Sequence, residues 1–246
     1  MKDIEELINK RKKYKNTILQ KKLNSKKNTV AYVTTDKKPR VLKWFVPGLK
    51  RNMENEYKVL KKAQSELNVP TIFEKDDKNN VLILNYIIGE NLCDIINDED
   101  TSYKEKERLM IFLSEWFYTF HNFFKKDNEF LIHGDPTLRN FIFTDRIWGM
   151  DFEETRSGRP VEDIAGACAS LLSTDPMFTK EKYRLCNVLI DNYIKLAPGR
   201  ISDINKDIAY SLLEKIQWRP EQEETLRKYS KRIRQKGIKA IFEKVI

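Results

Sequence analysis

The chain has 246 residues, of which 40% are apolar and 34% are charged, and its formal net charge is +9. This length and composition are typical of a soluble globular protein with a sizeable core, built as one domain or as two small lobes. The most apolar window, residues 109–124, is too short to cross a membrane and includes polar side chains, so a buried helix is expected there.

Three cysteines at no metal-ligand spacing, Cys93, Cys168 and Cys186, argue against a disulfide framework and for a reducing compartment. The first fifteen residues are charged throughout and lack the apolar region of a signal peptide, so a cytoplasmic protein is expected. The positive charge suits a polyanionic partner, such as a nucleotide, an anionic membrane surface or another acidic surface. No DNA- or RNA-binding motif accompanies the basic runs, and a lysine-rich solvated surface is the simpler interpretation.

The first half of the chain predicts a strand-rich region with one main helix. Polar turns separate three strands, and a helix with apolar side chains at helical spacing follows them and ends before Pro70. The predicted order is a short charged helix over residues 3–15, strands over 17–24, 30–35 and 40–45, the main helix over 51–67, and strands over 71–75 and 81–86.

The second half predicts mostly helices, and Gly89 marks the turn into it. His121 falls within a long predicted helix, where packing and a hydrogen bond are its expected role. With only two histidines in the chain, a histidine-based metal site is not credible. The predicted order is helices over residues 91–97 and 103–125, a hairpin over 141–150, a connector over 152–162, a helix opening at Asp163, and helices from 178 onward with breaks at 198–199 and 219–220.

The segment from His133 to Asp151 holds the strongest functional signal. Asp135 is followed five residues later by Asn140, and Asp151 comes eleven residues after that. The predicted hairpin between Asn140 and Asp151 brings the second carboxylate back toward the amide. An amide oxygen and a carboxylate are ligands that Mg²⁺ prefers, which leaves Asp135 free to orient a hydroxyl. A surface hairpin with scattered acids is the alternative, and the joint pattern disfavours it.

This pattern resembles the catalytic and metal loops of the protein-kinase-like superfamily. The variants His-Gly-Asp and Asp-Phe-Glu are similar to its aminoglycoside and choline phosphotransferase branch, whereas ordinary protein kinases have His-Arg-Asp and Asp-Phe-Gly. The resemblance covers residues 17–175 and implies an α+β, two-lobed protein-kinase-like fold. In that fold, a nucleotide-binding N-lobe (residues 1–87) has a small antiparallel sheet and one main helix. A mostly helical C-lobe (88–246) carries the catalytic loop, the metal site and acceptor-binding helices.

In the N-lobe, the resemblance assigns Lys43 to the α- and β-phosphates of ATP and expects a glutamate on the next helix to fix it. Glu54 and Glu56 both compete for that role, and Glu56 lines up better with the family pattern. The backbone carbonyl of Asn85 and the backbone N–H of Ile87 are implied to face adenine. The alternative interpretation is that Lys43 is an ordinary solvent-facing strand lysine and that Glu56 is an exposed helix glutamate.

In the C-lobe, the resemblance implies that Asp135 accepts or orients the proton of the acceptor hydroxyl. Asn140 and Asp151 are implied to hold Mg²⁺. His133 and Asp163 are implied to support the backbone of the catalytic loop, although an acid such as Asp163 is also favoured in the first turn of any helix.

Two features depart from ordinary protein kinases. The first turn, often glycine-rich in the family, is Ser25-Lys26-Lys27-Asn28 here; asparagine tolerates a positive φ, and either lysine could contact phosphate. Only eleven residues separate Asp151 from Asp163, with no Ala-Pro-Glu motif and no long segment for docking a peptide.

The resemblance implies a kinase that uses ATP and Mg²⁺ to phosphorylate a hydroxyl. The short connector favours a small sugar- or alcohol-like acceptor. A compact atypical serine/threonine protein kinase is the first alternative. A nucleotide-binding pseudokinase or scaffold is the second, and the absence of glycine from the first turn favours it.

Overall fold

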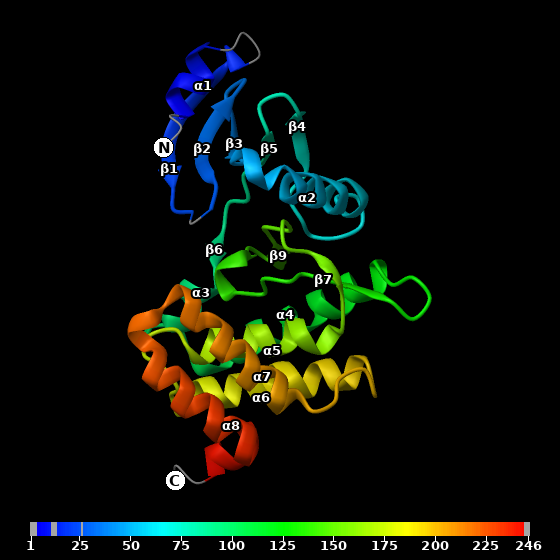
Figure 1. Cartoon of the computed structure of the whole chain (residues 1–246), viewed down its shortest axis with the longest axis vertical. Coiled ribbons are helices and arrows are strands. Elements are labelled where there is room, and N and C mark those ends of the chain that lie inside the picture. Colours follow the sequence, from blue (N-terminus) through cyan, green and yellow to red (C-terminus); the bar gives the residue numbers. More distant parts are fainter. Residues whose placement is uncertain (1–3, 11–13, 26, 244–246) are drawn as a thin grey trace. The chain divides into compact units, whose positions relative to one another are not determined.

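The computed structural model describes residues 4–10, 14–25 and 27–243, and it divides the chain into two compact units (Figure 1). The N-terminal unit contains Met1–Ile88 together with Asp151–Glu154, and the C-terminal unit contains Gly89–Met150 and Thr155–Ile246. The short segment Asp151–Glu154 therefore packs with the N-terminal unit, although the residues on either side of it belong to the C-terminal unit.

The N-terminal unit is built on a five-stranded sheet in the order β1-β2-β3-β5-β4, in which every neighbouring pair is antiparallel. This is the small antiparallel sheet with one main helix that the sequence predicts. Its elements are α1 (Ile4–Lys10), β1 (Thr17–Leu23), β2 (Thr29–Thr35), β3 (Lys38–Trp44), the 3-10 helix η2 (Pro47–Leu49), α2 (Lys50–Ala63), β4 (Ile72–Asp76) and β5 (Val81–Asn85).

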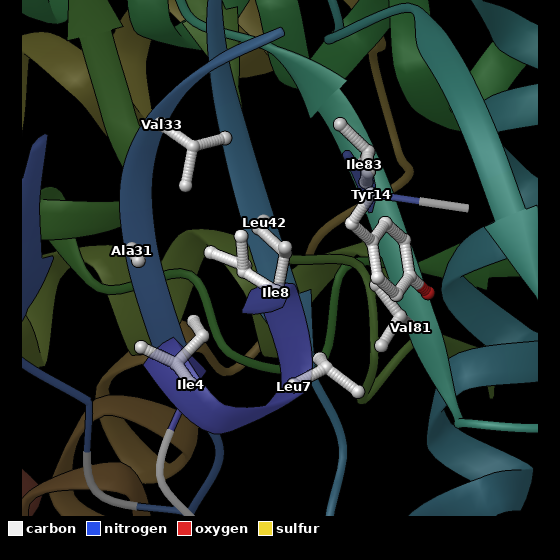
Figure 2. Close-up of a cluster of buried hydrophobic side chains, with 9 residues drawn as sticks. All are labelled: Ile4, Leu7, Ile8, Tyr14, Ala31, Val33, Leu42, Val81 and Ile83. Carbon is white, nitrogen blue, oxygen red and sulfur yellow. The ribbon is translucent and has the colours of Figure 1, made fainter. Parts of the chain in front are cut away.

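One face of this sheet is covered by α1, and Figure 2 shows the apolar cluster between them. Ile4, Leu7 and Ile8 lie at helical spacing and are buried, which defines an apolar side on a helix that the sequence predicts only as charged. Of the predicted range 3–15, residues 4–10 are α-helical and residues 14 and 15 are not, while residues 3 and 11–13 lie outside the described part. The cluster comprises Ile4, Leu7, Ile8, Tyr14, Ala31, Val33, Leu42, Val81 and Ile83.

Successive side chains of β3 point to opposite faces of the sheet. Leu42 points into the cluster under α1, whereas Lys43, the next residue, points to the other face because side chains alternate along a strand. β2 pairs with β3 from Thr29 opposite Trp44 to Thr35 opposite Lys38, without a register shift. The strand alternation thus places Lys43 on the face that α1 does not cover.

The C-terminal unit is mostly helical, with α4 packed against α6, α5 against α7, and α7 against α8. Among the described residues, no helix is both long enough and apolar enough to cross a membrane. The helices are α3 (Leu92–Asn97), α4 (Tyr103–Phe123), α5 (Pro160–Leu172), α6 (Lys180–Leu196), α7 (Ile204–Glu214) and α8 (Glu223–Glu243), with 3-10 helices η3 (Leu138–Asn140), η4 (Lys215–Trp218) and η5 (Pro220–Gln222).

The C-terminal unit also contains short paired strands between its helices. The predicted hairpin is confirmed: β8 (Phe141–Phe143) pairs with β9 (Ile147–Gly149), and β6 (Glu90–Asn91) adds a third strand. The connector differs from the prediction because β10 (Arg156–Gly158) pairs with β7 (Phe130–Ile132). A three-residue strand of arginine, serine and glycine carries no alternating pattern, so only the pairing partner reveals it.

Two local predictions differ from the structure: the residue at which α5 begins and the reason that a glycine occupies position 89. Helix α5 begins at Pro160 and not at Asp163, because proline suits the first helical position, where its missing N–H is not needed. Gly89 is required by a close approach: a Cβ at this position would overlap the carbonyl oxygen of Phe143.

Candidate active site

The centre of the N-terminal unit is a group of three carboxylates around one lysine. The Nζ atom of Lys43 lies 2.7 Å from Oε2 of Glu56, 2.5 Å from Oδ1 of Asp151 and 2.9 Å from Oε2 of Glu153. The lysine and Glu56 are 6% and 1% exposed, so this is a buried ion pair and not a solvent-facing contact. We call these four residues the Lys43 cluster.

Helix α2 brings Glu56, the glutamate that the family pattern favours over Glu54, to Lys43. Glu56 lies on the same buried side as Met53 and Leu60, which is the side that meets the rest of the unit. Glu54 instead forms an ion pair with Lys75, at 2.7 Å. The pairing of Glu56 with the lysine of β3 follows from the rotation of the helix; the role of this pair toward ATP stays a prediction.

The charges in the Lys43 cluster are unequal. Burial lowers the pKa of Lys43, but the three carboxylates outweigh burial and leave the pKa raised, so the ammonium stays charged. Burial raises the pKa of Glu56, and Lys43 opposes that shift. Because the pKa of Glu56 stays raised, at about 7, Asp151 and Glu153 are the two carboxylates that one ammonium has to balance, and oxygen atoms of all three acids lie within 4.8 Å of one another. The cluster therefore suits an additional cation or donor.

The segment that supplies Asp151 and Glu153 has a distinctive backbone. Asp151 has φ of +62°, in the left-handed region that non-glycine residues seldom adopt. Phe152 is fully buried, and Asn55 of α2 donates from Nδ2 to the carbonyl oxygen of Glu153 at 3.1 Å. The Asp151 side chain is 40% exposed, which leaves part of its carboxylate accessible.

The turn between β1 and β2 is fastened to the same segment by side chains. Asn28 is buried and donates from Nδ2 to Oε2 of Glu153 at 2.6 Å, while Lys27 contacts Oε1 of Glu154 at 2.5 Å. Asn28 is not among the described residues with a positive φ, so it acts through its side chain and not through the turn conformation that its sequence suggests. Lys26, the other predicted phosphate contact, lies outside the described residues.

In the C-terminal unit, Asn140 holds Asp135. Its Nδ2 atom donates to the Asp135 backbone carbonyl at 2.9 Å and to Oδ2 of the same residue at 3.2 Å. The backbone carbonyl oxygen of Asn140 accepts a hydrogen bond from the N–H of Met150, the residue before Asp151, at 2.8 Å. Because the amide nitrogen is used by Asp135, the amide oxygen of Asn140 is the atom available to a hard cation.

Asp163 fixes the backbone immediately before Asp135. Its carboxylate accepts from the N–H of His133 at 2.7 Å and from the N–H of Gly134 at 3.1 Å. Gly134 has φ of +83°, where glycine carries no steric penalty. Burial raises the pKa of Asp163, but the hydrogen bonds from His121 and His133 and their charges outweigh burial and leave it lowered.

His121 completes this arrangement, which we call the Asp163 brace (Asp163 with His121, His133 and Gly134). Its ring is fully buried, with Nε2 2.9 Å from Asp163 and Nδ1 2.8 Å from the hydroxyl of Tyr193. The expected role of His121 in packing and hydrogen bonding is confirmed. His133 has a second contact, between Nε2 and the carbonyl oxygen of Met150 at 2.9 Å.

The predicted adenine contacts lie at the end of β5. The backbone N–H of Asn85 donates to the carbonyl oxygen of Thr71 at 2.9 Å, and its side chain accepts from Arg40. The ring of Tyr86 lies 4.7 Å from the ring of Tyr32. The contacts of Asn85 and Ile87 with adenine stay predictions.

The predicted site residues therefore form two groups, one in each unit. Sequence reasoning assigned no role to Glu153, although it stands in the Asp-Phe-Glu motif, and it missed the inward side chain of Asn28, for which the sequence offers no signal. The N-terminal group is Lys43, Glu56, Asn85, Ile87 and Asp151; the C-terminal group is His133, Asp135, Asn140 and Asp163.

The sequence matches no protein-family model, and it matches none of the curated proteins. Solved structures nevertheless share its fold over nearly the whole chain. A ternary complex of streptomycin, ATP and APH(2″)-IIa is 17% identical, with a TM-score of 0.60, and the match covers 91% of this chain and 90% of that chain.

Two further solved structures match the chain over most of its length. The aminoglycoside phosphotransferase APH(2″)-Ib, ADP-bound, is 14% identical (TM-score 0.61; coverage 95% and 97%). A choline/ethanolamine kinase family protein from Mesorhizobium loti is 13% identical (TM-score 0.59; coverage 92% and 92%). The chain thus has the protein-kinase-like fold, in the form that aminoglycoside phosphotransferases and choline or ethanolamine kinases share, as the sequence motifs predict.

Proposed function

We propose that the chain is an ATP-dependent phosphotransferase that moves the γ-phosphate of ATP to a hydroxyl of a small sugar- or alcohol-like molecule. The observation that carries this proposal is the buried pair of Lys43 and Glu56, with Asp151 on the same ammonium. The fold adds support, since structural neighbours include complexes with ATP and with ADP.

Each residue has a defined task in this proposal. Lys43, kept charged by its carboxylates, binds the α- and β-phosphates, and Glu56 fixes its position. Asp135, held by the amide of Asn140, orients the acceptor hydroxyl and takes its proton. The bond from the hydroxyl oxygen to the γ-phosphorus forms as the bond from that phosphorus to the β-phosphate oxygen breaks, with ADP as the leaving group.

The donor set fits Mg²⁺. The amide oxygen of Asn140 and the partly exposed carboxylate of Asp151 are hard oxygen ligands, and the uncompensated negative charge of the Lys43 cluster favours a cation beside Asp151. When bound, Mg²⁺ would neutralise charge on the phosphates.

The connector supports a small acceptor over a peptide. Between Asp151 and α5 it contains β10, which is paired with β7, and α5 begins at Pro160. This leaves little free chain on which a substrate peptide could dock. Incubation with labelled ATP and either a metabolite pool or a protein lysate separates the two acceptor classes: label in small molecules supports the proposal, and label in protein alone supports the atypical protein kinase.

A nucleotide-binding scaffold is the second candidate, and one observation favours it. In the glycine-free turn, Asn28 contacts Glu153 and Lys27 contacts Glu154. Glu153 also contacts Lys43, the residue proposed to bind the phosphates. A scaffold needs no turnover, so a turn held in place by the contacts of Asn28 and Lys27 would suit it.

Thermal unfolding with and without Mg²⁺-ATP tests nucleotide binding. A ligand at a hundredfold excess over its Kd stabilises by about 2.7 kcal/mol, which for a chain of this length raises Tm by roughly 5–10 °C. We expect this rise to require Mg²⁺ and to disappear in Asp151→Asn. Absence of any shift at millimolar nucleotide would contradict both the enzyme and the nucleotide-binding scaffold.

Turnover separates the enzyme from the scaffold. Steady ADP release with an acceptor, reduced about 10²-fold or more in Asp135→Asn, supports the phosphotransferase because that variant loses a single electrostatic contributor. Binding of nucleotide without acceptor-dependent turnover supports the scaffold.

A further inference from the structure

The C-terminal unit has an open surface pocket of about 380 Å³ that the proposed function does not use. This volume lies within the range of small-molecule sites in proteins. Its walls come from β7, β10, the first turn of α5 and the loop between α6 and α7. We call it the Arg200 cavity; its lining residues are Asn128, Glu129, Phe130, Ser157, Gly158, Arg159, Pro160, Val161, Arg200 and Ser202.

Arg200 is the notable charge in this cavity. Its guanidinium lies 4.9 Å from the ring centre of Phe130 and 5.6 Å from that of Tyr118. Within the described part of the chain, no carboxylate forms an ion pair with it; its side chain hydrogen-bonds the hydroxyl of Tyr193, and its Nη1 has no hydrogen-bond partner. An anion in the pocket would therefore meet no competing carboxylate at this guanidinium.

The other charges on the walls are balanced or screened. Arg159 is neutralised by Asp207 at 2.6 Å and by Glu162 at 3.4 Å. Glu129 is exposed, where water and salt screen its carboxylate. Arg200 is then the cation that lacks a protein counter-ion, next to apolar walls supplied by Phe130, Pro160 and Val161.

We propose that the Arg200 cavity binds a small organic anion, a carboxylate or phosphate monoester with an apolar body, and that this site is coupled to the catalytic loop. Arg200 binds the anionic group, because a guanidinium presents several donors in a planar fork. The apolar body packs against Phe130, Pro160 and Val161. This is a binding site distinct from the residues proposed for phosphoryl transfer.

A continuous chain of buried polar groups carries the coupling. The first link is a side-chain hydrogen bond between Arg200 and the Tyr193 hydroxyl, which with the guanidinium charge opposes the effect of burial and leaves the pKa of Tyr193 raised to about 12. The hydroxyl meets Nδ1 of His121 at 2.8 Å, and Nε2 of His121 meets Asp163 at 2.9 Å. Asp163 in turn accepts from the N–H of Gly134, the residue before Asp135.

The donors along this chain point in one direction. In the tautomer that carries its proton on Nε2, His121 donates to Asp163 and accepts at Nδ1 from the Tyr193 hydroxyl. The oxygen of Tyr193 is then free to accept from Arg200. An anion that draws the guanidinium toward the cavity removes this charge from Tyr193, and the change reaches the catalytic loop through groups that are fully buried.

Binding is tested with three simple probes: benzoate, phenyl phosphate, and benzyl alcohol as the neutral analogue. Calorimetry on the full chain should show saturable binding of both anions and none of the alcohol. Arg200→Met should weaken benzoate binding about tenfold or more, since a charge-assisted contact is lost. Arg200→Lys keeps the charge and should retain part of the affinity.

The matched control is Arg156→Met, which removes an exposed arginine of the same connector that does not line the cavity. Its benzoate affinity should equal that of the unmodified chain. The proposal is overturned if neither anion binds saturably, if benzyl alcohol binds equally well, or if Arg200→Met leaves benzoate binding unchanged.

Coupling is tested by hydrogen–deuterium exchange of the peptide that covers residues 133–140. Benzoate should change its exchange rate in the unmodified chain. In Tyr193→Phe benzoate should still bind, but the exchange rate should no longer respond. An unchanged rate in the unmodified chain would overturn the coupling. None of these readouts requires ATP or turnover, so their failure is distinct from failure of the proposed phosphotransferase.

Discussion

Two carboxylates, the buried Asp163 in the C-terminal unit and the partly exposed Asp151 beside Lys43, have opposite surroundings. Asp163 is fully buried and its oxygens are occupied by His121 and by two backbone N–H groups. Asp151 is 40% exposed and shares one ammonium with Glu56 and Glu153. The first arrangement is satisfied and holds a backbone in place. The second carries excess negative charge and is suited to receive a ligand.

The largest expected effect comes from breaking the Asp163 brace. Asp163→Asn replaces one accepting oxygen with a donor that faces buried N–H groups, so those groups lose a partner. We expect the free energy of unfolding to fall by about 3 kcal/mol or more, measured by urea denaturation. A loss below about 1 kcal/mol would contradict the view that the brace is a structural centre.

The matched change in the Lys43 cluster is Asp151→Asn, which keeps a residue type that tolerates the left-handed backbone at this position. It removes one of three carboxylates from a single ammonium, so unfolding free energy should change by less than about 1 kcal/mol. Turnover should fall about 10²-fold or more. If Asp151→Asn instead destabilised the chain as much as Asp163→Asn, the contrast between the two carboxylates would be wrong.

A smaller effect is expected at the turn between β1 and β2. Asn28→Ala removes a buried hydrogen bond to the charged Glu153 and should cost about 1.5–3 kcal/mol of unfolding free energy. Lys27→Ala is the control, because its ion pair with Glu154 is exposed and should contribute less than about 1 kcal/mol. Equal losses in the two denaturant titrations would show that burial of Asn28 does not matter.

The smallest expected effect is on the pH dependence of stability. The pKa of Asp163 is lowered in the folded chain from its ordinary value of 3.8, so the unfolded chain binds the proton more tightly. Its ionisation therefore stabilises the fold above that ordinary pKa, and this contribution is lost as pH falls through the lowered value. Unfolding free energy measured from pH 6 down to acid should fall more steeply for the unmodified chain than for Asp163→Asn. Parallel curves would contradict this.

Much of the fold follows from local pattern. The strands, the main helix and the hairpin were predictable because alternation, helical spacing and polar turns are properties of neighbouring residues. The spacing from His133 to Asp151 was likewise sufficient to indicate the fold that the solved structures share. The strand β10 and the apolar side of α1 were missed, since each is defined by the surface that it meets.

The amino-acid sequence by itself determined which residues could form the site: Lys43 on a strand, a glutamate on the next helix, and Asp135, Asn140 and Asp151 at set intervals. Tertiary structure decided which side chains meet. It chose Glu56 over Glu54 through the rotation of α2, brought Glu153 to Lys43, and turned Asn28 inward. These choices depend on packing between segments up to 125 residues apart, as for Asn28 and Glu153, and no local pattern encodes such a distance.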